Sequence, residues 1–141
     1  MPSFKIFDIA GSGLSAQSVR LNTVASNLAN ADSVSGDPGS VYKARHPVFK
    51  AVHAALAATQ GAAQSGPVVQ VAGIVESHAA PTVRHDPGNP LADAQGNVYA
   101  PNVNVIEEMT DMISASRSYQ NNVEVMNTAK DLMLATLKLG Q

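Results

Sequence analysis

The sequence predicts an α+β fold, mainly α, with a long helix at each end of the chain and a small irregular β insert between them. Two observations predict it. Apolar residues step by four and three along both ends of the chain, which is typical of paired helices. Seven of the eight prolines and seven of the ten glycines lie within residues 33–101. We therefore expect the two helices to pack as a coiled-coil-like pair with the insert outside it.

The C-terminal helix carries the strongest pattern. No Pro or Gly interrupts residues 105–139, and Asn104 with Glu107 has the spacing of a capping box. A helix of about 35 residues rises roughly 52 Å, whereas a compact domain of this length has a radius of gyration of only about 14 Å. The helix is too long to bury its apolar stripe against its own domain, so we expect it to have partner helices.

The N-terminal helix is expected over residues 4–31. Gly11 and Gly13 lie within it and cost about 1 kcal/mol each relative to alanine, so packing must stabilise this helix. Gly11-Ser12-Gly13 is expected to allow close helix approach or local flexibility. Polar Gln17 and Lys130 lie in the apolar stripes and are candidates for setting register. We define the predicted seam, the expected subunit-packing surface, as Leu14, Leu21, Val24, Leu28, Val105, Met109, Met112, Tyr119, Val123, Met126, Met133 and Leu137.

The middle of the chain reads as short strands and turns. The residues divide into an N-terminal helical segment (1–33), a β-rich outer insert (34–101) and a C-terminal helical segment (102–141), which together form one structural unit. Within the insert, short strands are expected at 41–44, 47–52, 68–76 and 81–84, a small polar linker at 57–66, and turns at 86–90 and 95–97.

Composition and motifs argue against several classes of function. The net charge is −2 and no basic run occurs, so no nucleic-acid partner is expected. There is no cysteine, and the four histidines lack the spacing of a zinc motif. No nucleophile elbow or dinucleotide loop occurs. We expect no catalytic residue, metal, cofactor or small-molecule substrate. Adjacent Glu107 and Glu108 point about 100° apart, and we interpret them as compensating the helix dipole.

Targeting signals are weak. The start of the chain lacks the apolar core and small-residue cleavage site of a secretory signal, and no apolar run approaches 18 residues. If the protein leaves the cytoplasm, we expect a route without a cleaved signal.

The helices could instead pair within a monomer, or the chain could be a soluble coiled-coil adaptor that forms a small oligomer.

Three segments carry a resemblance to a known family. VRLNTVASNLANADS (19–33), DPGNPLADAQGNV (86–98) and the stretch from residue 101 to 141 closely resemble the flagellar basal-body rod proteins. Asn27 and Asn30 lie in a motif shared across rod and hook relatives. Among the residues of the C-terminal stretch, those that favour the proximal-rod subunit are Asn102, Asn104, Glu107 and Glu108. Asn89 departs from the family, which has His at that place in the turn.

The resemblance implies a structural subunit without catalytic activity. Such proteins polymerise helically into the periplasmic rod, the drive shaft that transmits torque for motility. The implied partners are copies of the chain, other rod proteins, the inner-membrane ring with its rod-base adaptor, and the flagellar type III export apparatus. The helical ends would form the inner tube, and the numerous asparagines would bond neighbouring subunits. A distal-rod or hook-type axial subunit is the related alternative.

Overall fold

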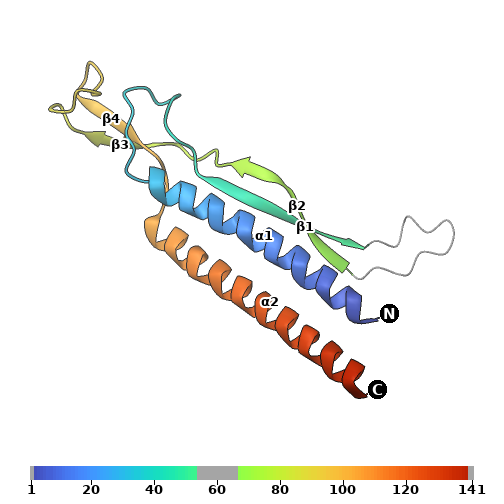
Figure 1. The fold of residues 1–141 in the computed structure, drawn as a ribbon. Helices are drawn as coiled ribbons and strands as arrows, with labels where there is room; N and C mark the ends of the chain where they lie inside the picture. Colours follow the sequence, from blue (N-terminus) through green and yellow to red (C-terminus); the bar gives the residue numbers. More distant parts are fainter. Residues whose placement is uncertain (1, 54–66, 140–141) are drawn as a thin grey trace.

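The computed structural model describes residues 2–53 and 67–139. Two helices enclose four strands along the chain (Figure 1). The elements are α1 (Pro2–Asn30), β1 (Arg45–His53), β2 (Pro67–Glu76), β3 (Thr82–His85), β4 (Asn97–Ala100) and α2 (Val105–Leu139). The predicted mainly helical fold, with a helix at each end and small antiparallel strand pairs between them, is confirmed.

The elements form an elongated molecule with α1 in the middle. Figure 1 shows α1 and α2 side by side, with both termini at the same end. β1 and β2 form an antiparallel ribbon that contacts α1 on the side away from α2. β3 and β4 form a second antiparallel pair at the opposite end from the termini. In the described part of the insert, β1 and β2 pack on α1.

Two strands of the insert differ from the expectation. Residues 41–44 are not a strand, although Val41 and Ala44 are buried and the Ala44 carbonyl accepts a hydrogen bond from the Ser77 backbone N–H (2.7 Å). No strand was expected after the turn at 95–97, yet Asn97–Ala100 forms β4 and buries Val98 and Ala100 on one face. The expected linker at 57–66 and the expected helix stop at Gly140 lie outside the described residues.

Small side chains dominate the buried positions. Among the residues whose burial the structure describes, six of the nine buried hydrophobic residues are alanines, and Val98 is the largest hydrophobic side chain that is fully buried. Small residues let two helix backbones approach each other closely. They also bury little apolar area, so the hydrophobic effect within one chain is modest.

Gly36 is required where the chain leaves α1. A Cβ added there would meet the carbonyl oxygen of Leu91, which is backbone and cannot swing aside. We therefore expect Gly36→Ala to lower the free energy of unfolding by at least about 1–3 kcal/mol, as overpacking does. Urea denaturation followed by circular dichroism measures this. Gly11→Ala is the control, because a Cβ at Gly11 meets no atom within 4 Å; that variant should be as stable as the parent or more so.

The turn before β4 is organised by one carboxylate. The side chain of Asp93 accepts hydrogen bonds from the backbone N–H groups of Gln95 (2.9 Å) and Asn97 (2.8 Å) and from the Tyr99 hydroxyl (3.2 Å). Gly96 takes a positive φ of 77° within the turn, where glycine is unstrained. The hydrogen bond from Asn97, followed by the others, lowers the pKa of Asp93. The bond to Asp93 raises the pKa of Tyr99.

The two pKa shifts predict that this turn loses stability at both extremes of pH. Because the pKa of Asp93 is lowered on folding, its stabilisation is present above about pH 4 and is lost as the pH falls through the folded pKa. Because the pKa of Tyr99 is raised, its contribution is present below about pH 10 and is lost at higher pH. Amide exchange at Gln95 and Asn97, followed by NMR, measures the loss. An Asp93→Asn variant should show neither transition.

Candidate functional site: an assembly interface

A buried asparagine joins the helix pair to the insert. Asn27 on α1 has no solvent exposure. Its Nδ2 donates to Glu108 Oε1 on α2 and to the Arg45 carbonyl oxygen, both at 2.9 Å. Its Oδ1 accepts from the Arg45 backbone N–H and from the Tyr42 hydroxyl, also at 2.9 Å. Both donors and both lone pairs of the amide are used, so one side chain holds three parts of the chain together.

Glu108 has a different role from the one expected. It lies in the first turn of α2, where a negative charge complements the helix dipole. However, it is also buried and accepts the Asn27 hydrogen bond, whereas the adjacent Glu107 is exposed. The dipole interpretation therefore fits both residues but misses the contact that Glu108 makes with α1.

The other residues of the family motif serve the helix ends. Asn104 caps α2, since its Oδ1 accepts from the backbone N–H groups of Ile106 (3.1 Å) and Glu107 (3.4 Å). Asn30 donates back to the Ser26 carbonyl at the end of α1. Asn102 is exposed and lines a small hollow beside the insert. Asn27, Asn30 and Asn104 thus make bonds within the chain, where bonds to neighbouring subunits were expected.

The departure at Asn89 is accommodated in its turn. Asn89 Oδ1 accepts from the Leu91 backbone N–H at 3.0 Å, and its Nδ2 lies 3.5 Å from Asp86 Oδ2. The Asn89 backbone N–H also donates to the Asp86 carbonyl. The side chain therefore closes the turn locally.

The face that α2 turns toward α1 repeats every seven residues. Glu108, Ala115 and Ala129 are the buried residues of α2, and Asn122 completes the spacing. Asn122 meets α1 at Gly13, where an added Cβ would lie 2.8 Å from its Nδ2. Gly13 therefore allows close helix approach, while Gly11 faces open space. Arg20 and Asp111 add an ion pair of 2.6 Å at the side of this contact, worth about 0–1 kcal/mol because both are partly exposed.

The predicted seam lies on one flank of this facing line. Most of its positions on α2 precede the facing line by three residues, or roughly 60° around the helix, whereas Met109, Val123 and Leu137 follow it by one residue, or roughly 100° to the same side. Met112, Met126 and Met133 are half-buried at the edge of the α1 contact. Val105, Met109, Tyr119, Val123 and Leu137 are exposed. On α1, Val24 is buried and Leu14, Leu21 and Leu28 are half-buried. The pair thus covers the α1 part of the seam and leaves much of the α2 part open.

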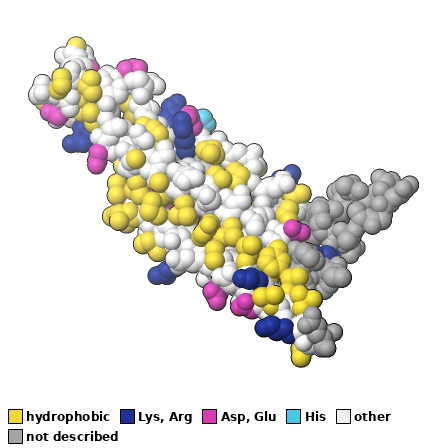
Figure 2. All heavy atoms as spheres, viewed as in Figure 1, with side chains coloured by type: hydrophobic (Ala, Val, Ile, Leu, Met, Phe, Trp, Pro, Cys, Tyr) yellow, Lys and Arg dark blue, Asp and Glu magenta, His cyan; other side chains and the backbone are white. Residues whose placement is uncertain are grey.

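Exposed apolar side chains continue along the open side of α2. Figure 2 shows hydrophobic side chains gathered over the first half of this helix. Ile106 (77%) and Leu137 (67%) lie on this side of the helix, whereas Leu132 (63%) is exposed on the other side of the facing line. Contiguous apolar surface of this kind marks an interaction site on a soluble protein. The arrangement can bury helices of neighbouring molecules along the flank.

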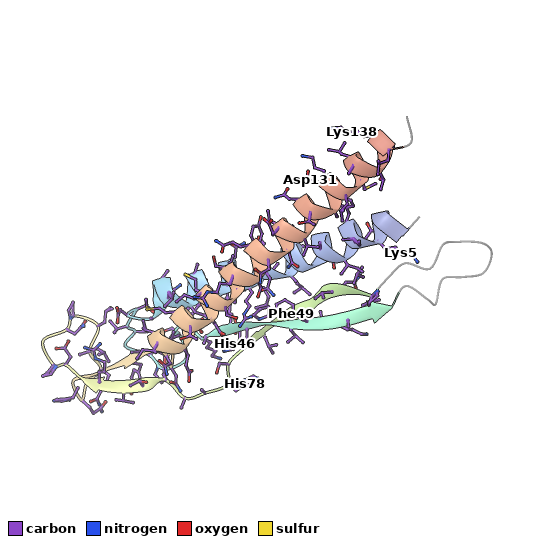
Figure 3. All side chains as sticks on the ribbon, turned by 90° about the horizontal axis from the view of Figure 1, so that it is seen from below. Lys5, His46, Phe49, His78, Asp131 and Lys138 are labelled. Atoms are coloured by element: carbon purple, nitrogen blue, oxygen red, sulfur yellow. The ribbon has the colours of Figure 1, made fainter. Side chains whose placement is uncertain are left out.

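The histidines of the insert and the charged residues near the chain ends lie apart from one another. Figure 3 shows His46 and Phe49 on β1 and His78 after β2, with Lys5 on α1 and Asp131 and Lys138 toward the far end of α2. Within residues 2–53 and 67–139, no group of three or more His, Cys, Asp or Glu side chains is placed to hold a metal ion. No helix in the described part of the chain is long and apolar enough to span a membrane.

Comparison with known proteins places the same residues in one family. Residues 7–36 match the family model for flagella basal body rod protein, and residues 94–139 match that for the flagellar basal body rod FlgEFG protein C-terminal. These two ranges contain most of α1 and all of α2 that the structure describes. They therefore include Asn27, Glu108 and every residue of the predicted seam.

Full-length relatives carry the assignment. The chain is similar to proteins named flagellar basal-body rod protein FlgC from Escherichia coli O6:H1 (56% identical) and Salmonella typhimurium (55%), each over 100% of both chains. The Aquifex aeolicus protein of the same name is 36% identical over 98% of this chain and 97% of its own. Identity of this extent, together with the two helical segments matched above, shows that the chain belongs to the flagellar basal-body rod protein family.

Proposed function

We propose that the chain is a structural subunit of the flagellar basal-body proximal rod, which polymerises helically through its terminal helices and transmits torque for motility. The full-length identity to proteins named as basal-body rod proteins supports the proposal. The observation that carries it is the apolar flank of α2, which one chain leaves uncovered.

The exposed area of the chain supports assembly. The accessible surface is 9614 Å². A compact monomer of 14.6 kDa would expose only about 6,900 Å². The excess of roughly 2,700 Å² exceeds the approximately 800 Å² that one partner buries in a standard interface. A subunit packed among several neighbours would bury this extra surface. A protein that works as a compact monomer would not expose it.

The remaining features of the proposal follow from this role. The three segments, 1–33, 34–101 and 102–141, act as one unit whose helical ends pack in a coiled-coil-like manner; the seven-residue spacing of the α1-facing positions supports this packing. The partners are copies of the chain, other rod proteins, the inner-membrane ring with its rod-base adaptor, and the type III export apparatus. The chain would reach the periplasmic part of the basal body without a cleaved signal, and it would act without catalysis or a cofactor.

Gene replacement tests the proposal. Deleting the gene from a motile strain that carries it should abolish swimming and remove the rod from purified basal bodies, and the plasmid-borne chain should restore both. The restored chain should co-purify with the basal body. A deletion strain that still builds complete basal bodies, or a chain absent from those particles, would contradict the proposal.

A further inference from the structure

The β1–β2 ribbon has two outer edges, and its hydrogen bonds show which backbone groups point out of each. In an antiparallel pair, successive residues direct their N–H and C=O groups alternately toward the partner strand and away from it. The Ser77 N–H donates to the Ala44 carbonyl at 2.7 Å, so the next residue, Arg45, directs its own N–H and C=O away from β2. On β2, the Val69 N–H donates to Ser12 on α1 and so points away from β1.

α1, which lies along the ribbon (Figure 1), supplies a side chain to each of these edges. The Asn27 amide accepts from the Arg45 N–H and donates to the Arg45 carbonyl, both at 2.9 Å. These are the two hydrogen bonds that a neighbouring strand would make with Arg45. The Ser12 hydroxyl accepts from the Val69 N–H at 3.2 Å and donates to the Ile9 carbonyl at 2.8 Å. Asn27 and Ser12 thus stand in for strand partners, and we call these two contacts the edge caps.

Both edge caps lie where α1 also meets α2. Asn27 donates to Glu108 at one end of the helix pair. Toward the other end, Gly13 follows Ser12 directly and lies against Asn122. Because the caps and the helix contact use the same positions on α1, a movement of α1 away from α2 would also uncover the ribbon.

An uncovered edge of this ribbon would have the character of a strand that pairs with other molecules. No charged residue occurs from position 67 to 75, and five of these nine residues are Val or Ile. Long, uncharged, β-branched edge strands take up strands from other molecules unless the edge is blocked. Val69, Ile74 and Val75 are 37–53% exposed, so apolar side chains are available beside the edge.

We propose that the side chains of Asn27 and Ser12 act as an autoinhibitory device, which keeps the ribbon of one copy from pairing edge to edge with the ribbon of a second copy. A second copy is the partner that an open edge would take, because it carries the same uncharged strand and the same outward N–H and C=O groups. This pairing differs from the assembly of the proposed function, and the fold of the single chain prevents it.

The double variant Ser12→Ala/Asn27→Ala tests the edge caps on the purified full-length chain. Sedimentation velocity should show larger species than the parent forms at the same concentration. In dilute solution, amide exchange should be faster than in the parent at both Arg45 and Val69. At Val69 the increase should be roughly 2–10-fold, which is the effect of one neutral hydrogen bond. In the associated species both amides should be protected again, because a second ribbon replaces the caps.

Two further variants separate the caps from general loss of stability. Ser15→Ala/Asn22→Ala removes the same two residue types from exposed positions of α1 and should sediment like the parent. Ser12→Ala alone keeps the Asn27 hydrogen bonds and uncaps only β2. Its circular dichroism should match the parent, and it should still associate more strongly than the parent does.

Proline at outward-pointing positions should reverse the association. Ala51 lies opposite Val69 in the ribbon, so both residues direct their N–H groups outward. Proline has no N–H, so Ala51→Pro and Val69→Pro each remove a donor from an outer edge without removing a bond between the two strands. Adding both substitutions to the double-alanine variant, or Val69→Pro to Ser12→Ala, should restore the sedimentation of the parent.

Two results would overturn the inference. If Ser12→Ala exchanges its Val69 amide faster but sediments like the parent, then an open edge does not pair with a second copy. If association persists after Val69→Pro is added to Ser12→Ala, then it does not run through the edge of β2. Neither result bears on the proposed function, which gene replacement tests separately.

Discussion

Asn27→Ala is expected to lower the free energy of unfolding by at least about 3 kcal/mol. The change removes four hydrogen bonds at once. It leaves the Glu108 carboxylate buried without its amide partner, together with both backbone groups of Arg45. Each buried polar group that loses its partner costs about 1–3 kcal/mol, and a charged group costs more. Urea denaturation, monitored by far-ultraviolet circular dichroism, measures the change.

Asn22→Ala provides the matched control. Asn22 is the same residue type on the same helix, but its side chain is exposed. Its replacement should change stability by no more than about 0.5 kcal/mol. A loss at Asn27 as small as that at Asn22 would contradict the assignment of the junction. A double-mutant cycle with Glu108→Ala should give a coupling energy of about 0.5–3 kcal/mol, since the two side chains bond directly.

The junction at Asn27 connects stability to assembly. It fixes where β1 leaves the helix pair, and the ribbon covers one side of α1 from that point. The side of α2 away from α1 then remains free.

The helices could be predicted because their signal is local. Apolar steps of three and four residues and the Asn104 cap lie within each segment, and both helices form as expected. Which face of α2 meets α1 could not be predicted in the same way. Periodicity of apolar residues finds the most hydrophobic line, whereas α1 selects small residues that permit close approach, Ala115 and Ala129 among them. The most apolar line of α2, the predicted seam, therefore lies beside the surface that meets α1.

Non-local contacts explain what else the sequence did not reveal. Nothing near Asn27 indicates that its partners are Tyr42, Arg45 and Glu108, up to 81 residues away. The sequence of β4 did not predict a strand. Its pairing with β3 and the burial of Val98 depend on the rest of the insert, which the local sequence does not show. Asn27 and Glu108 are both buried on facing helices, but only the structure shows that they are paired, so the sequence could not identify this contact.

Val123→Asp is expected to reduce the amount of chain in purified basal bodies at least tenfold and to abolish swimming. Val123 is 37% exposed in the single chain, on the open flank of α2. A carboxylate there remains solvated in the monomer, so the free energy of unfolding should fall by only about 1 kcal/mol. In the assembly, a neighbouring helix would bury the charge without a partner, at a cost of several kcal/mol. Since a loss of 1.4 kcal/mol is already tenfold in an equilibrium, incorporation should fail.

Two further variants distinguish assembly from folding. Ser114→Asp adds the same charge at an exposed residue on the side of α2 opposite Val123, and it should swim like the parent. Met112→Asp should also block incorporation, but with a clear loss of monomer stability, because Met112 is half-buried beside α1. Normal swimming of Val123→Asp would refute the flank as an interface. If Val123→Asp and Met112→Asp lowered the free energy of unfolding of the monomer equally, Val123 would belong to the core of a single chain. A residue that contacts only neighbouring subunits is solvated in the monomer, so a charge there should destabilise the monomer little.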